Sequence, residues 1–217
     1  MILLETQVYA IECTETHLPK GFVYLDEIDP TIDQKLEFAT EEKNLGVPAD
    51  GYETGRAICT KEAAHALVKI QKKLKKEGLC LRICDAYRPA RAVEHIKRWA
   101  KDLNDQKTKA RYYPHIPKEE ILGTFVAANR SSHSRGSTVD VILVEDITKE
   151  PLDFWADGFV EESYTYCSQL TKEQQQNRLK LRKIMLAYGF KPYNKEYWHF
   201  TLKNEPFPET YFDFPVR

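Results

Sequence analysis

The chain of 217 residues carries 32 basic and 33 acidic side chains, for a formal net charge of -1, and is 42% hydrophobic and 30% charged. This composition excludes an intrinsically disordered chain, and the scattered lysines give no basic stripe that would indicate nucleic-acid binding. No linker, repeat or low-complexity segment divides the sequence, so we expect a single domain over residues 1–217.

The residues from Met1 to Glu5 lack the basic region and apolar core of a signal peptide, and no apolar run approaches the roughly 18 residues of a membrane span. We therefore expect a cytoplasmic protein with no membrane span. The cysteines are odd in number and form no CxxC pair, which favours buried thiols in a reducing compartment. They are Cys13, Cys59, Cys80, Cys84 and Cys167.

The first strong element is an amphipathic helix predicted over residues 60–77. Thr60 is a suitable N-cap, and Gly78 stands where the end of a helix needs a positive φ. Apolar residues recur between them at helical spacing: Ala63, Leu67, Ile70 and Leu74. This stripe predicts one face packed against a core.

A strand is predicted over residues 79–84, and it runs into Asp85-Ala86-Tyr87-Arg88-Pro89. Pro89 keeps Arg88 out of helical geometry and suits the first turn of a following helix. Arg88 therefore lies at a strand-to-helix junction, where the backbone is fixed at both ends and the side chain can be aimed.

Residues 139–144 are apolar and mostly β-branched except for Asp140, a pattern that predicts a strand buried on both faces. An ionised carboxylate in such a strand needs a partner, because burying it alone is very costly. His133 lies seven residues before it, across a short turn, so metal binding by both side chains is the favoured interpretation. A salt bridge to Arg135 is the alternative.

A second helix is predicted over residues 171–188 by a capping box of Thr171 and Gln174 and by Gly189 at its end. Residues 190–201 then favour extended structure. Helices and strands alternate at uneven lengths, without a regular βαβ period. We therefore expect an α+β fold with a largely antiparallel central sheet flanked by helices.

Glu196 and His199 are three residues apart, which on a regular strand would place them on opposite faces. If the strand begins at about Tyr197, Glu196 lies in the preceding turn and can lean over the same side as His199. We favour this arrangement over a helical one, because the aromatic residues and Thr201 prefer extended structure.

His133, Asp140 and His199 would supply three N/O ligands and leave a fourth position for water, as a hydrolytic zinc requires. The same set can hold Fe(II), but iron oxygenases usually place the first histidine and the acid two residues apart. Glu196 favours zinc, since a carboxylate that is not a ligand can act as general base. Arg88 would stabilise the oxyanion; a surface or helix-capping ion pair is its alternative role.

Three motifs of the chain together resemble the zinc D-alanyl-D-alanine dipeptidases of the VanX type. They are Asp85-Ala86-Tyr87-Arg88-Pro89, Ser131-x-His133-x6-Asp140 and Glu196-x-x-His199. The resemblance runs nearly end to end and includes Pro48-Ala49-Asp50-Gly51-Tyr52-Glu53 and the closing Tyr211-Phe212-Asp213-Phe214-Pro215.

The resemblance implies the α+β fold of zinc DD-carboxypeptidases and the hedgehog signalling domain. It implies one zinc per chain on His133, Asp140 and His199, with Glu196 as base and Arg88 as the arginine of the transition state. By the same resemblance, Ser131 would help to hold the substrate carboxylate, and Asp157 would pair with the free substrate amine.

The chain departs from the family pattern at three positions. Thr138 stands where the family usually has Ala, Tyr197 where it usually has Trp, and Phe38 where a Tyr often lines the amine end. The loop before Asp157 also looks short. These departures leave the zinc ligands and the base unchanged and concern the fit of the substrate's amino end.

The expected activity is therefore zinc-dependent hydrolysis of D-Ala-D-Ala to two D-alanines, with a small dipeptide as partner and neither nucleic acid nor membrane. Assembly into a homo-oligomer is left open. The alternatives are a DD- or LD-carboxypeptidase acting on cell-wall peptides and a non-catalytic, hedgehog-like zinc-binding module. Glu196 and Arg88 argue against the module, because a structural zinc closed by four protein ligands needs neither.

Overall fold

The centre of the molecule is a five-stranded sheet with the order β2-β4-β5-β7-β6. The computed structural model describes residues 18–124, 129–153 and 161–217. Within these ranges β2 pairs with β4 in parallel, and the other neighbouring pairs of this sheet are antiparallel. The strands are β2 (Asp33–Gln34), β4 (Leu79–Asp85), β5 (Thr138–Glu145), β6 (Phe190–Tyr193) and β7 (Glu196–Leu202). The expected α+β fold with a largely antiparallel sheet is confirmed.

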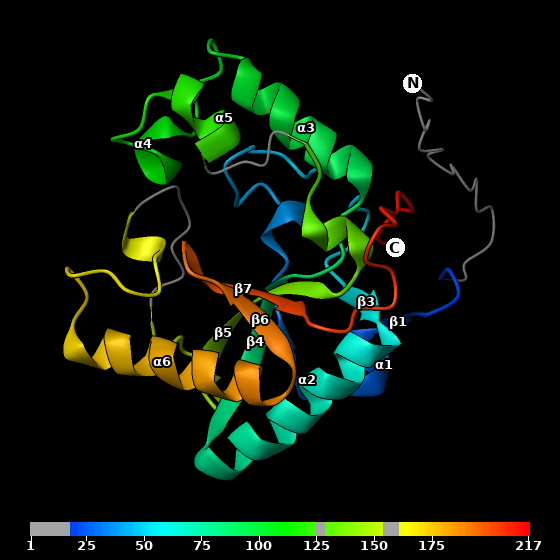
Figure 1. Cartoon of the computed structure of the whole chain (residues 1–217). Helices are drawn as coiled ribbons and strands as arrows, with labels where there is room; N and C mark the ends of the chain where they lie inside the picture. Colours follow the sequence, from blue (N-terminus) through cyan, green and yellow to red (C-terminus); the bar gives the residue numbers. More distant parts are fainter. Residues whose placement is uncertain (1–17, 125–128, 154–160) are drawn as a thin grey trace, which may run out of the picture.

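Helices flank this sheet on both sides (Figure 1): α2 and α6 lie on one side, and α3, α4 and α5 lie on the other. Beside it, β1 and β3 form a separate antiparallel pair. The remaining bounds are β1 (Phe22–Tyr24), β3 (Ile58–Thr60), α1 (Leu25–Ile28), α2 (Lys61–Leu74), α3 (Ala90–Lys101), α4 (Lys109–Tyr112), α5 (Ile121–Thr124) and α6 (Lys172–Ala187). Single 3₁₀ turns are η1 (Glu37–Ala39), η2 (Lys75–Glu77), η3 (Lys118–Glu120), η4 (Ser132–Arg135) and η5 (Glu161–Ser163).

Both long helices predicted from the sequence begin and end as their capping residues indicate. Thr60 accepts a hydrogen bond from Ala63 N at the start of α2, and Gly78 follows the last turn with a φ of 71°. The capping box of α6 is complete, with Thr171 Oγ1 accepting from Gln174 N and Gln174 Oε1 accepting from Thr171 N. Each of these capping hydrogen bonds joins residues only three positions apart, so the ends of both helices can be predicted from local sequence.

The strand β5 is buried along its length apart from Glu145, as its apolar composition predicts. Its register decides where the polar residues meet. Asp140 lies opposite Asp85 of β4 on one side and opposite His199 of β7 on the other. Three polar side chains that are far apart in the sequence are therefore brought to one end of three adjacent strands.

Four of the five cysteines fall in the described ranges and are free thiols, as expected. Cys59, Cys80 and Cys84 are buried and Cys167 is partly buried, whereas Cys13 lies outside the described residues. In those ranges, none of the helices combines the length and the apolar character that crossing a bilayer requires.

Candidate metal centre and active site

Three side chains from three elements converge at the end of β5. They are His133 of η4, Asp140 of β5 and His199 of β7. His133 Nε2 lies 3.4 Å from Asp140 Oδ1 and 3.3 Å from His199 Nδ1, and His199 Nδ1 lies 3.1 Å from Asp140 Oδ1. Donors bound at about 2.0–2.1 Å in a tetrahedral shell lie about 3.3 Å from one another. The three atoms therefore fit a zinc ion without rearrangement.

Hydrogen bonds on the far side of each imidazole fix which nitrogen faces the cluster. His133 Nδ1 lies 2.8 Å from the carbonyl oxygen of Ala86, so it carries the proton and leaves the Nε2 lone pair for a metal. His199 Nε2 lies 3.4 Å from Ser132 Oγ, which leaves Nδ1 for the cluster. Both rings therefore turn a nitrogen with a free lone pair toward the cluster. The contacts with Ala86 and Ser132 that orient them could not be predicted from the sequence spacing of the two histidines.

Asp140 is 6% exposed and makes its contacts with the two histidines. Although burial acts to raise it, His133 and His199 hold the pKa of Asp140 well below its usual range, so the carboxylate is ionised. The alternative salt bridge to Arg135 is wrong. Arg135 instead donates to both carboxylate oxygens of Glu205, at 2.8 and 2.9 Å.

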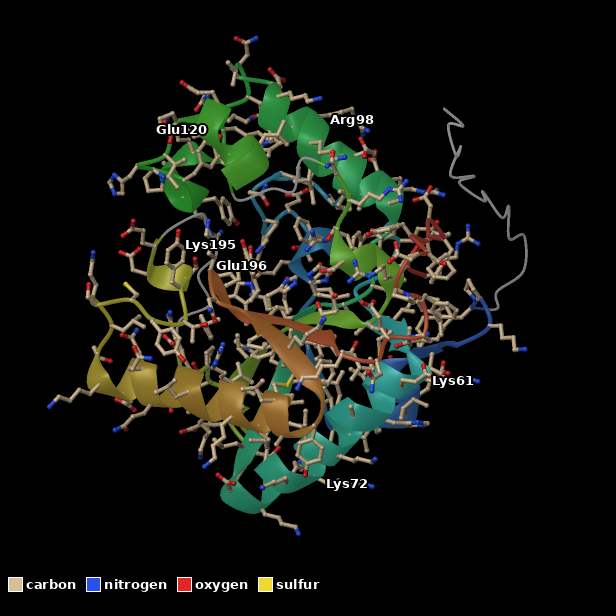
Figure 2. The ribbon with its side chains drawn as sticks, viewed as in Figure 1. Lys61, Lys72, Arg98, Glu120, Lys195 and Glu196 are labelled. Carbon is tan, nitrogen blue, oxygen red and sulfur yellow. The ribbon has the colours of Figure 1, made fainter. Side chains whose placement is uncertain are left out.

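Glu196 reaches the edge of the cluster, with Oε2 3.4 Å from His199 Nδ1. It lies outside the group of donor atoms that are all within 4.8 Å of one another. Burial raises the pKa of Glu196, which brings its carboxylate closer to the basicity of an effective general base. Figure 2 shows Lys195 and Glu196 at the tip of the β6–β7 hairpin.

One expected boundary differs here: β7 begins at Glu196 and not at Tyr197. The register between β6 and β7 shifts between Pro192 and Tyr193, and Tyr193 then pairs with Glu196. This irregularity breaks the strict alternation of side chains at the end of the hairpin. Glu196 and His199 can therefore share one side although they are three residues apart.

Arg88 lies beside the same cluster and is not a surface residue, since its side chain is 14% exposed. Its Nε and Nη2 both donate to Asp85 Oδ2, at 2.9 and 2.7 Å, and Nη2 lies 3.9 Å from Asp140 Oδ2. The guanidinium carbon lies 4.5 Å from the centroid of the Phe38 ring. A fixed positive charge is thus held next to the three candidate ligands.

The two expected substrate contacts have different outcomes. Ser131 is the N-cap of η4, and its Oγ accepts from His133 N at 3.4 Å, so it supports the turn that carries His133. Asp157 lies outside the described residues. A role for either residue in binding substrate stays a prediction.

The three departures from the family pattern make structural contacts. Phe38 lies against Arg88, and Thr138 Oγ1 lies 2.9 Å from Thr201 Oγ1 across β5 and β7. Tyr197 is 3% exposed, and the guanidinium carbon of Arg178 lies 4.0 Å from its ring centroid. Thr138 and Tyr197 therefore fill positions in the fold, whereas Phe38 borders the site.

The motifs found in the sequence include Asp85 and Tyr52 and span Ser132, but they assign no role to any of the three. Asp85 is 2% exposed and accepts hydrogen bonds from Arg88 and from Tyr52 Oη. Its burial next to an arginine was the available signal, because an acid at the end of a buried strand needs a cation or donors.

Comparison with known proteins gives one consistent result. A family described as D-ala-D-ala dipeptidase matches residues 19–217. The chain is 39% identical over 199 residues to the D-alanyl-D-alanine dipeptidase of Enterococcus faecium, which covers 91% of this chain and 98% of that protein. It is 39% identical over 201 residues to the enzyme of that name from Enterococcus faecalis, covering 92% and 100%. The corresponding protein of Streptomyces coelicolor is 39% identical over 197 residues, covering 90% and 98%.

Proposed function

Because the chain belongs to the D-Ala-D-Ala dipeptidase family of metallopeptidases, we propose that it is a zinc enzyme that hydrolyses D-Ala-D-Ala to two molecules of D-alanine. The observation that carries the proposal is the approach of His133 Nε2, Asp140 Oδ1 and His199 Nδ1 to within 3.1–3.4 Å of one another. Two imidazoles and a carboxylate are the donor set of hydrolytic zinc sites.

One zinc ion per chain would be held by these three residues. When bound, the metal supplies a Lewis acid that polarises the scissile carbonyl and increases the acidity of a water molecule. The backbone carbonyl of Ala86 and the hydroxyl of Ser132 hold the two imidazoles in the ligating tautomers.

Glu196 is the general base. Its carboxylate takes a proton from the attacking water as the water oxygen forms a bond to the carbonyl carbon. It then gives that proton to the leaving amine as the C–N bond breaks, so the base is restored. The distance of 3.4 Å between Glu196 Oε2 and His199 Nδ1 supports this role, because it places the carboxylate beside the ligands without making it one of them.

Arg88 stabilises the negative charge that develops on the carbonyl oxygen. Asp85 accepts hydrogen bonds from the Nε–H and from one N–H of Nη2, and no hydrogen-bond acceptor for Nη1 is found among the described residues. The guanidinium therefore keeps donors for a substrate oxygen while its plane is fixed by the acid behind it.

Selection of a dipeptide follows if both ends of the substrate are paired. Ser131 would bind the carboxylate end, and Asp157 would pair with the free amine. A longer or acylated peptide would then leave a charge without its partner in a small pocket, which is strongly unfavourable.

The test compares three substrates on the purified, zinc-loaded protein. Free D-Ala-D-Ala should release D-alanine much faster than N-acetyl-D-Ala-D-Ala or a pentapeptide that ends in D-Ala-D-Ala. Equal turnover of free and acetylated dipeptides would replace the dipeptidase proposal with a carboxypeptidase. Stoichiometric zinc without turnover of any of the three would point to the non-catalytic zinc-binding module. Loss of zinc in His133→Ala and His199→Ala, with folding retained, would confirm the ligands.

A further inference from the structure

Behind Arg88 lies a buried carboxylate whose two oxygen atoms have different partners. Asp85 Oδ2 accepts from Arg88 Nε and Nη2, whereas Asp85 Oδ1 accepts from the hydroxyl of Tyr52 at 2.7 Å. Asp85 is 2% exposed and Tyr52 is 7% exposed, so both act in a region that water barely reaches. Hydrogen bonds in such a setting are stronger and more directional than at the surface.

We propose that Tyr52 is a positioning residue for Arg88, which it orients through Asp85. The inference rests on the proposed function, in which Arg88 stabilises the oxyanion. The terminal torsion of an aspartate has a broad energy minimum. A bond to Oδ1 is therefore needed to fix the carboxylate plane, and that plane in turn fixes the guanidinium fork.

The guanidinium has an alternative partner close by. Arg88 Nη2 lies 2.7 Å from Asp85 Oδ2 and only 3.9 Å from Asp140 Oδ2, and the two acids are opposite one another on β4 and β5. If Asp85 turned away, Arg88 would move toward Asp140, where it would pair with a candidate metal ligand and leave the position of the substrate oxygen. Tyr52 opposes this change by holding Asp85 in place.

Tyr52 remains a donor under the conditions of the reaction. Burial raises the pKa of its phenol well above the usual range, and the charge of Asp85 adds to the effect. Its ring also lies 6.3 Å, between centroids, from that of Phe38, which lies against the guanidinium of Arg88. The arginine is thus limited by an acid and an aromatic ring, and Tyr52 contacts both.

The backbone around Tyr52 is held by the end of the chain. Tyr52 N donates to Ala49 O at 3.0 Å, and Val216 N donates to Gly51 O at 2.8 Å. Gly51 has a φ of +89°, and a Cβ there would lie 2.9 Å from Arg91 Cδ. These contacts give a physical reason for one motif that the metal site does not use, the Pro48 to Glu53 segment.

The test replaces Tyr52 by Phe and uses Tyr87→Phe as the matched control. Tyr87 is also a buried tyrosine; within the described part of the chain its hydroxyl donates one hydrogen bond, to Phe214 O at 2.9 Å, and none to Asp85. Both variants lose one phenol hydrogen bond. A misplaced catalytic group costs roughly 10- to 100-fold in rate, so we expect kcat of Tyr52→Phe to fall by that factor with zinc and KM retained. Tyr87→Phe should keep its kcat.

A double-variant cycle separates positioning from a general loss of structure. Added to Arg88→Ala, Tyr52→Phe should lower kcat no further, because the group that it orients is already gone. If the two losses multiply, or if kcat of Tyr52→Phe equals that of Tyr87→Phe, the inference is wrong.

A second measurement does not depend on turnover. The NMR signal of the Arg88 Nε–H, assigned by its absence in Arg88→Lys, should exchange faster with solvent in Tyr52→Phe and stay unchanged in Tyr87→Phe. An unchanged signal in both variants would contradict positioning. If the two variants differ in exchange as expected but the wild-type protein does not hydrolyse D-Ala-D-Ala, the proposed function is refuted and the positioning of Arg88 by Tyr52 is not.

Discussion

Replacing Gly136 by Ala should destabilise the protein far more than the same change at Gly78. Both glycines have a positive φ, +82° at Gly136 and +71° at Gly78. A Cβ at Gly78 would meet nothing within 4 Å, whereas a Cβ at Gly136 would lie 2.2 Å from Cε1 and 2.7 Å from Cζ of Phe22. Gly78→Ala therefore measures the cost of backbone strain alone, and its difference from Gly136→Ala measures the cost of steric overlap with Phe22.

The ring of Phe22 has little room to move. It is 4% exposed and is surrounded by other aromatic rings at centroid distances of 4.9–5.7 Å: Tyr87, Phe207, Phe212 and Phe214. An L-residue in left-handed geometry costs about 1–2 kcal/mol, and overpacking a closed core adds about 1–3 kcal/mol. Gly136→Ala should therefore lose about 2–5 kcal/mol and Gly78→Ala about 1–2 kcal/mol, since the effect on the unfolded chain is the same in both.

Urea unfolding of the metal-free proteins, followed by far-UV circular dichroism, measures both differences. Gly136 N also donates to His133 O at 3.0 Å, so a shift of this turn should weaken zinc binding in Gly136→Ala and not in Gly78→Ala. In a Phe22→Ala background, Gly136→Ala should lose no more stability than Gly78→Ala. Equal free energies of unfolding for the two single variants would refute the steric argument.

Three further predictions concern the site and its support. Glu196→Gln should keep zinc and bind a phosphinate dipeptide analogue, while its kcat falls by about 10²–10⁴; loss of zinc, measured by metal analysis, would mean that Glu196 is a ligand. Arg88→Lys should keep zinc and lose about 2.7–4 kcal/mol of transition-state stabilisation, because lysine lacks the planar fork; near-normal kcat/KM would contradict this role. Arg178→Met should lose about 3–5 kcal/mol of stability in urea unfolding, since it leaves Asp153 buried without its cation. Lys180→Met, on the same helix as Arg178, breaks only an exposed ion pair with Glu77 and should change stability little; a similar loss in both variants would argue against the buried pair.

The sequence by itself determined the elements whose signals are local. The caps of α2 and α6 act within a few residues, and the apolar run of β5 needs two covered faces whatever packs on them. It also predicted the kind of site, because two histidines and an acid in these motifs narrow the choice of metal and reaction. A buried Asp140 had to have a strong partner, and this followed from the cost of burying a charge.

Only the tertiary structure decided which partner each charged group has. Asp140 lies next to His199 because of the register between β5 and β7. Arg135 forms an ion pair with Glu205, which is 70 residues away in the sequence. Tyr52 and Asp85 are 33 residues apart and meet because the carboxyl-terminal segment holds the Tyr52 turn in place. Sequence spacing fixes geometry over one or two turns of a helix or a few residues of a strand. Contacts between distant segments depend on sheet register and chain packing, and no local pattern encodes these.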